Sequence, residues 1–80
     1  MPKVFEYKGY KFFFFSNEGF PFKPSHIHVR KNSNLAKFWL EPNITLADSW
    51  GFKAQELRMV RAIVEENHEE FIKRWYEYFG

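Results

Sequence analysis

The heptapeptide PSHIHVR, residues 24–30, is the stretch from which the fold can be worked out. A proline-bounded loop leads into alternating polar and apolar residues, the pattern of a β-strand whose successive side chains point to opposite faces. Ile27 and Val29 then lie on one face, the natural core face, while His26, His28 and Arg30 share the other. The two histidines define the candidate site, because no other segment fixes titratable side chains so close together.

Three further strands are expected around this one. Together the four predicted strands cover residues 3–7, 10–16, 26–31 and 35–41. Lys8 and Gly9 supply the turn of a first hairpin, and residues 32–34 supply the turn of another. Pro42 ends the fourth strand because a proline cannot donate to the hydrogen-bond ladder.

Four consecutive phenylalanines, residues 12–15, break the alternation of the second strand. Neighbouring side chains in a strand cannot share a face, so both faces of this strand need cover. A loop follows at residues 17–25. We expect its Phe20 and Phe22 either to fold back as a lid on the core or to offer an adhesive surface.

The second half of the chain reads as a connector followed by helices. Residues 43–51 form the expected connector, pinned to the core by Ile44, Leu46 and Trp50. Apolar residues then recur at helical spacing. Because Asn67 with Glu70 resembles a capping box that restarts a helix, we expect two helices. Their predicted ranges are residues 53–66 and 68–79.

These elements predict one α+β domain over residues 1–80, a four-stranded, mostly antiparallel sheet with two C-terminal helices packed on one face. The absence of cysteine excludes disulfides and thiolate metal sites and indicates a reducing, cytoplasmic location. No apolar run reaches the roughly 20 residues that span a bilayer. Aromatic residues make up 22% of the chain, enough to support a compact core at this length.

Charge is unevenly distributed along the chain. Residues 1–40 carry seven Lys or Arg and two acidic residues, whereas residues 41–80 carry five and eight. The basic first half could steer an anionic partner toward the sheet. The alternative is that the lysines only keep the strands soluble and protect their edges.

A set of ordered motifs covers nearly the whole chain. It comprises PSHIHV at residues 24–29, AKFWLEP at 36–42, Gly51-Phe52 before ELR at 56–58, VEEN at 64–67, and Trp75. This order resembles the small bacterial proteins grouped as domain of unknown function 4160. The chain departs from the family pattern at Ser25, Ile27 and Lys53, where a second proline, an aromatic residue and a capping residue are usual.

The resemblance implies a bacterial protein with no assigned activity. Members of the family are often encoded beside another small protein, an arrangement that looks like toxin–antitoxin organisation. The implied partner is therefore a small protein, although self-association and RNA remain open, and no membrane is expected.

Five side chains form the expected binding face of the sheet, namely His26, His28, Arg30, Lys37 and Trp39, with Glu41 beside them. Trp39 would anchor or stack, the cations would supply charge, and the imidazoles would supply hydrogen bonds. These features predict a protein- or RNA-interaction module that needs no cofactor.

Two alternatives use the histidines differently. In a small ribonuclease-like enzyme, His26 and His28 would act as general base and general acid beside a cation. In a metal-binding protein the same pair would supply two imidazole ligands, with a third ligand from elsewhere. The remaining alternative is that the rings of His26 and His28 are only structural, with one of them hydrogen-bonded to the loop backbone.

Overall fold

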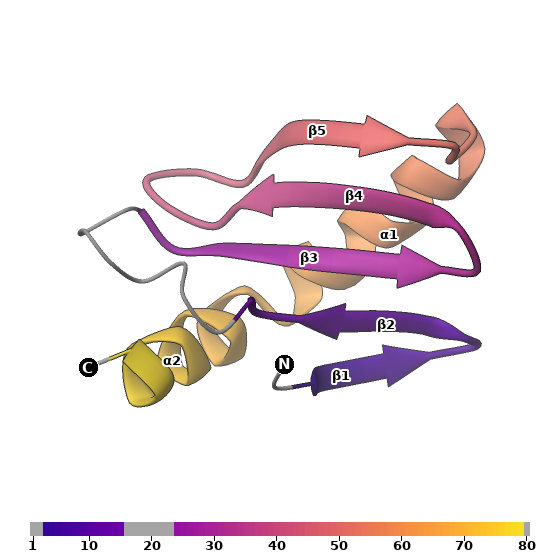
Figure 1. Ribbon diagram of the computed structural model, residues 1–80. Helices are drawn as coiled ribbons and strands as arrows, with labels where there is room; N and C mark the ends of the chain where they lie inside the picture. The colour runs from indigo at the N-terminus through magenta and orange to yellow at the C-terminus, as the bar shows by residue number, and fades with distance from the viewer. Residues whose placement is uncertain (1–2, 16–23, 80) are drawn as a thin grey trace.

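The computed structural model describes residues 3–15 and 24–79 and shows a five-stranded antiparallel sheet followed by two helices (Figure 1). The strands are β1 Lys3–Tyr7, β2 Tyr10–Phe13, β3 His26–Lys31, β4 Asn34–Trp39 and β5 Thr45–Trp50. The helices are α1 Ala54–Glu66 and α2 His68–Phe79. Each strand pairs with its neighbour in the chain, in the order β1-β2-β3-β4-β5. The predicted α+β class and the strands-then-helices order are confirmed.

The expected connector at residues 43–51 is wrong, because Thr45–Trp50 forms the fifth strand. Lys37 pairs with Asp48 while Phe38 pairs with Leu46, so Ala47 is an extra residue on β5. Such a bulge shifts the two-residue alternation by one position. The strand was therefore hidden from a periodicity argument.

The ends of two predicted strands also change. The second strand, expected over residues 10–16, ends at Phe13, and the fourth ends at Trp39 rather than at residue 41. Leu40 leaves the ladder but its N–H still donates to the Ser25 carbonyl at 2.8 Å. The predictions for Phe20 and Phe22 lie outside the described residues.

The hairpin turn between β1 and β2 is built as expected. Lys8 and Gly9 have φ of 47° and 85°, the two positive values of a type I′ turn, whose twist matches that of the flanking strands. Gly51, between β5 and α1, also has a positive φ, 88°, which favours glycine. A Cβ there would in addition force the Asn34 side chain to move.

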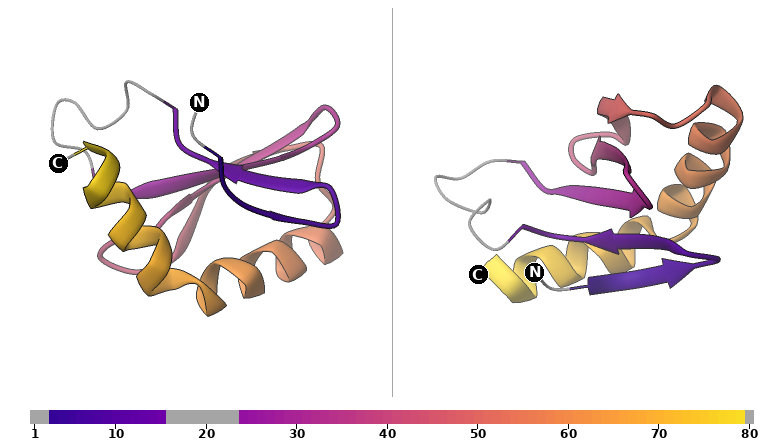
Figure 2. Two further views of the ribbon diagram at one scale, coloured as in Figure 1. Left: turned by 90° about the horizontal axis from the view of Figure 1, so that it is seen from below. Right: turned by 45° about the vertical axis from the view of Figure 1, so that its right-hand side comes forward.

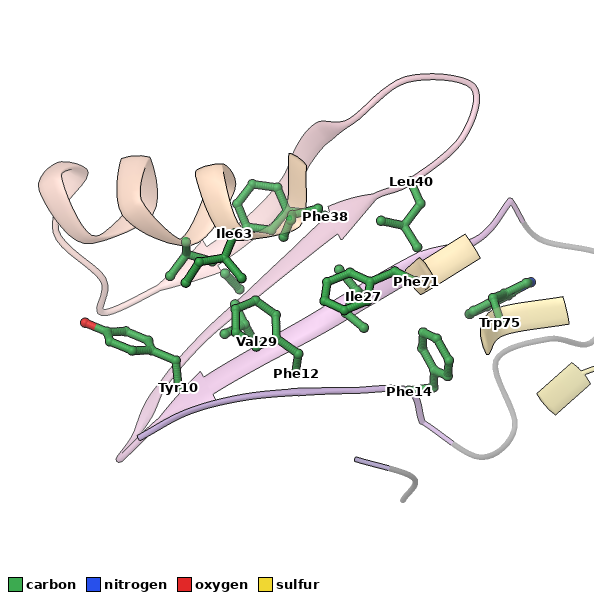
Figure 3. Packing of buried hydrophobic residues seen from close by; sticks show 13 residues of the cluster. Tyr10, Phe12, Phe14, Ile27, Val29, Phe38, Leu40, Ile63, Phe71 and Trp75 are labelled. Carbon is green, nitrogen blue, oxygen red and sulfur yellow. The ribbon is translucent and has the colours of Figure 1, made fainter. Parts of the chain in front are cut away.

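Both helices lie on one face of the sheet (Figure 2). The core forms between them and that face, and Figure 3 shows its side chains meeting. The strands, with the residues that directly follow β2 and β4, contribute Tyr10, Phe12, Phe14, Ile27, Val29, Ala36, Phe38 and Leu40, and the helices contribute Val60, Ile63, Val64, Phe71 and Trp75. Phe12 and Phe14 therefore belong to the core, whereas Phe13 and Phe15 contact His28 on the opposite face. The prediction that the phenylalanine run needs cover on both faces is confirmed.

The predicted break between the helices is also confirmed, although its chemistry differs. The Asn67 side-chain amide donates to the Ile63 carbonyl at 2.8 Å, so it caps the end of α1. The first backbone bond of α2 runs from the Phe71 N–H to the Asn67 carbonyl. His68 then donates its Nε2–H to the Leu40 carbonyl at 2.6 Å, which ties the start of α2 to the end of β4.

Candidate functional site

The face of the sheet opposite the helices, called the open face below, is organised in rows that cross the strands. Residues paired directly across strands point to the same side of a sheet. The first row is Glu6, Lys11, Arg30, Leu35 and Trp50. The second is Phe13, His28, Lys37 and Asp48, and the third is His26, Trp39 and Thr45. The open face thus holds all five residues predicted as a binding face.

The two histidines do not form an exposed surface, contrary to the expectation of a binding face open to solvent. His26 is 0% exposed and His28 is 6% exposed. They lie in what we call the imidazole–aromatic cluster, which consists of Phe13, Phe15, His26, His28, Trp39 and Trp75. Burial in this cluster makes both rings part of the packing at one end of the sheet.

His26 occupies the centre of the imidazole–aromatic cluster. Its ring centroid lies 5.3 Å from Trp39 and 4.7 Å from Trp75, which reaches it from α2. Its Nδ1 lies 3.0 Å from the Pro24 carbonyl oxygen. A carbonyl only accepts, so Nδ1 carries the proton and the tautomer is set by the loop backbone. The structural alternative for this histidine, a bond to its own loop, is the one observed.

His28 is enclosed by the outward half of the phenylalanine run. Its ring stacks on Phe13 at 5.6 Å and meets the edge of Phe15 at 4.3 Å. The ring centroids of the two histidines are 5.3 Å apart. Sequence spacing predicted this proximity, but the phenylalanines that cover His28 are contributed by β2 and the residues after it.

The other three predicted binding residues lie at the margin of the cluster and reach solvent. The Lys37 ammonium lies 4.3 Å from the centroid of the half-buried Trp39 ring. The exposed Arg30 guanidinium lies 5.5 Å from the centroid of Phe13. Both arrangements are cation–π contacts, which fix a long charged side chain over a ring face.

Glu41 does not lie beside the five predicted binding residues, contrary to expectation. Its carboxylate accepts hydrogen bonds from the Tyr76 hydroxyl at 2.7 Å and the Ser25 hydroxyl at 2.8 Å. These bonds, the Tyr76 bond first, hold the pKa of the Glu41 carboxyl below its usual value. Glu41 lies two residues beyond the end of β4 and, through Tyr76, links this end of the strand to α2 instead of facing the open side.

Sequence reasoning missed the basic group at the β1–β3 side of the open face. Lys11 pairs directly with Arg30, so two cations stand opposite each other on neighbouring strands. Lys3 joins them around a shallow hollow of about 110 Å³ with Phe13 in its lining. Lys3 also forms an ion pair with Glu6 at 2.8 Å. The signal was absent from the sequence because the pairing depends on strand register.

Trp50 was also missed, because its segment was read as a connector. It lies on the open face at the end of the first row, beside Leu35, and is 53% exposed. With Trp39 it places two indole rings on the β4–β5 side of the open face, while Lys3, Lys11 and Arg30 lie on the β1–β3 side. The open face therefore has an aromatic side, which also carries Lys37 and Asp48, and a basic side.

The burial of the two histidines limits the acid–base chemistry that their rings can perform. A general acid or base must reach the proton it transfers, and both histidine rings are enclosed by aromatic side chains. Among residues 3–15 and 24–79, no group of three or more His, Cys, Asp or Glu lies close enough to hold a metal ion. In the same described part of the chain, neither helix is long and apolar enough to cross a bilayer.

Comparison with known families gives one match. The model of the family described as domain of unknown function (DUF4160) matches residues 9–76, so the chain belongs to that family. Neither a curated protein nor a solved structure shows significant similarity to the chain.

Proposed function

We propose that this member of the DUF4160 family is a protein-interaction module that binds an acidic small protein through the open face of its sheet. The observation that carries the proposal is the direct pairing of Lys11 with Arg30. Like charges placed opposite each other destabilise a sheet. Glu6 faces Lys11 from β1 and offsets part of this cost, whereas the cross-strand neighbours of Arg30 are Lys11 and Leu35, neither of them acidic. An acidic group of a partner placed beside Arg30 would remove the remaining cost.

The two tryptophans supply the apolar half of such an interface. Trp and Arg are enriched among the residues that dominate binding energy at protein interfaces. Trp50 is more than half exposed, and Trp39 is held in place by Lys37 on one side and His26 beside it. A preorganised ring loses little side-chain entropy on binding. The imidazole–aromatic cluster then serves as the rigid support of the interface.

The partner that we propose is the small protein encoded beside the gene, in a toxin–antitoxin-like pair in the bacterial cytoplasm. The absence of cysteine in the chain fits a reducing compartment. The neighbouring product is the natural candidate because the family resemblance implies such a gene arrangement. Its binding surface should be acidic, matching Lys11 and Arg30.

Co-expression with the adjacent gene product tests this proposal. We expect a complex that survives purification, that weakens as salt is raised because exposed charges are screened, and that is lost with Arg30→Glu. Trp50→Ala should cost about 2 kcal/mol of binding free energy, the size of an interface hot spot. Lys73→Glu, an exposed reversal on α2, is the matched control and should bind normally.

A monomer that binds no adjacent gene product would refute the proposal. If the chain instead forms a complex with RNA, and both Arg30→Glu and Trp50→Ala abolish that complex, then the open face is an RNA-binding surface. RNA cleavage that disappears with His28→Gln, in a variant shown to be folded, would favour the enzyme alternative.

A further inference from the structure

β5 is an edge strand with little protection. It pairs only with β4 among the described residues, and five of its six residues are exposed. Natural edges are blunted by lysine, proline, bulges or inward-pointing charge. β1, the opposite edge, carries Lys3 and Glu6, whereas β5 has the bulge at Ala47 and Asp48 as its single charge. The outer edge of β5 therefore remains suited to pairing with another strand.

A hollow of about 170 Å³ lies beside this edge, between β5 and α1 on the core side of the sheet. Its lining residues are Phe38, Leu46, Leu57, Arg58 and Arg61. An apolar cavity of about 150 Å³ is large enough to hold benzene, so this hollow has room for a branched aliphatic side chain. Leu46, its β5 wall, is 41% exposed.

The outer edge of β5 and this hollow together form what we call the groove. We propose that the groove accepts an extended segment of a partner protein as a sixth strand. The segment places an apolar side chain in the hollow and an acidic side chain against Arg58. This inference rests on the proposed function, since it assigns to a protein partner a second contact beyond the open face. Strand addition of this kind draws affinity from main-chain hydrogen bonds and specificity from pockets for alternate side chains.

The two arginines at the hollow define the charge of the occupant. Arg61 is already engaged, because its Nη2–H donates to the Ile44 carbonyl at 3.0 Å and its Nε–H to Glu65 at 3.4 Å. Arg58 is exposed and has no ion pair within the described part of the chain. An incoming carboxylate is the group that would complete it.

A second copy of this chain fits the groove less well than an acidic segment. Residues paired across strands point to the same side, so a sheet continued through two β5 strands would keep the open faces of both copies on one side. Asp48, the single acidic residue of β5, pairs with Lys37 and so lies on the open face, away from Arg58 on the core side. The β5 strand of a second copy would therefore bring no carboxylate to Arg58, whereas an acidic strand would.

An extended chain can contact the hollow and Arg58 together, because Arg58 is itself part of the lining. Side chains two positions apart in a strand lie on the same face, about 6.6–6.8 Å apart. In the proposed complex, one side chain enters the hollow and the next on that face meets the guanidinium of Arg58. The predicted motif is an apolar residue and an acidic residue separated by one position.

A peptide titration tests the groove directly. The probe is an end-capped octapeptide, TVTETVTE, which places valine and glutamate alternately on one face of a strand. Followed by amide NMR shifts of the intact chain, it should perturb residues 45–50 together with Leu57 and Arg58, with a dissociation constant of about 1 mM or below. The lysine analogue, TVTKTVTK, should bind at least about tenfold more weakly.

Substitutions separate the contributions of the pocket and of the charge. Leu46→Asp should abolish the shifts, and Arg58→Glu should reverse the preference so that the lysine peptide binds better. Lys73→Glu on α2 is the control and should leave both titrations unchanged. Methylating alternate peptide amides should weaken binding for one of the two possible sets only, the set that faces β5.

Three outcomes would overturn the inference. They are no shift in β5 with either peptide at several millimolar, shifts confined to the open face around Arg30 and Trp39, or concentration-dependent dimerisation of the chain through β5. Arg30→Glu distinguishes this inference from the proposed function. It should prevent capture of the adjacent gene product while leaving the peptide shifts on β5 intact.

Discussion

The two faces of the sheet carry the same aromatic chemistry and use it differently. On the helix side, Phe12 and Phe14 meet Phe71 and Trp75 in a continuous apolar core. On the open side, Phe13 and Phe15 meet His28 beneath a margin of cations. One run of four phenylalanines thus supplies both layers. Burial alone therefore does not distinguish a core from a site, since Phe13 and His28 on the open side are nearly as closed to solvent as Phe12 and Phe14.

What differs is the polarity of the surroundings. The helix-side cluster is bordered by half-buried apolar side chains such as Val4 and Leu57. The open-face cluster is bordered by Arg30 and Lys37, with imidazoles in its interior. A layer that stabilises the fold and also presents charge is the arrangement expected of a rigid binding platform. Four predictions test this contrast.

Phe12→Ala should have the largest effect. The Phe12 side chain is fully buried and touches Phe5 and Phe71, so its loss should lower the free energy of unfolding by about 3–5 kcal/mol. Phe13→Ala should cost less, because the exposed Lys11 and Arg30 can move and water can enter. Urea denaturation measures both. Equal losses would mean that the open-face layer is as well packed as the core.

His26→Ala should come next, at about 2–3 kcal/mol in the same measurement, since a buried ring is removed from the centre of its cluster. Replacing the histidines by alanine should therefore lower stability as well, so an activity test needs volume-conserving replacements. His26→Gln keeps most of the volume and an amide group that can donate to the Pro24 carbonyl, so it should cost less than alanine. If His26→Ala is as stable as the parent chain, the imidazole–aromatic cluster does not contribute to the free energy of unfolding.

Acid should weaken the link between β4 and α2. The pKa of Glu41 is lowered in the folded protein, so its contribution to stability is present above the unfolded value of 4.5 and is lost as pH falls below it. Thermal unfolding from pH 6 to pH 3 should therefore show a steeper loss for the parent chain than for Glu41→Gln. Parallel pH profiles would contradict the hydrogen bonds from Tyr76 and Ser25.

Lys11→Glu should have the smallest effect on stability. It places an acidic side chain opposite Arg30 but also opposite Glu6, so the two cross-strand charge effects oppose each other and the free energy of unfolding should change by less than about 1 kcal/mol. The same change should weaken the complex with an acidic partner. Loss of binding with little change in stability would assign Lys11 to the interface, whereas a large loss of stability would mean that Lys11 serves the fold.

Much of the fold follows from local patterns, and the exceptions have physical causes. Alternation at residues 26–31 and the Lys8-Gly9 turn predicted β3 and the first hairpin correctly. β5 was missed because Ala47 bulges and shifts the alternation. Asn67 was correctly read as a break between helices, although its side chain bonds backward to Ile63 instead of forward.

The sequence predicted which residues share the open face, but it did not predict that the two histidines are buried. Period-two spacing placed His26, His28 and Arg30 on one face, and this holds. Their burial depends on Trp75, which arrives from a helix nearly fifty residues later, and on the phenylalanines of another strand. The opposition of Lys11 and Arg30 depends on register. Such non-local relations leave no periodic trace in the sequence.

The order of the strands has a consequence for how the protein is made. Every strand pairs with its immediate neighbour in the chain, so the sheet has a low contact order and should form quickly. The helices that cover its core face are translated after all five strands. At about 5–20 residues per second, the nascent sheet would expose Phe12 and Phe38 for a time on the order of seconds. We therefore expect the nascent chain to depend on chaperones during synthesis and the folded chain to be independent of them.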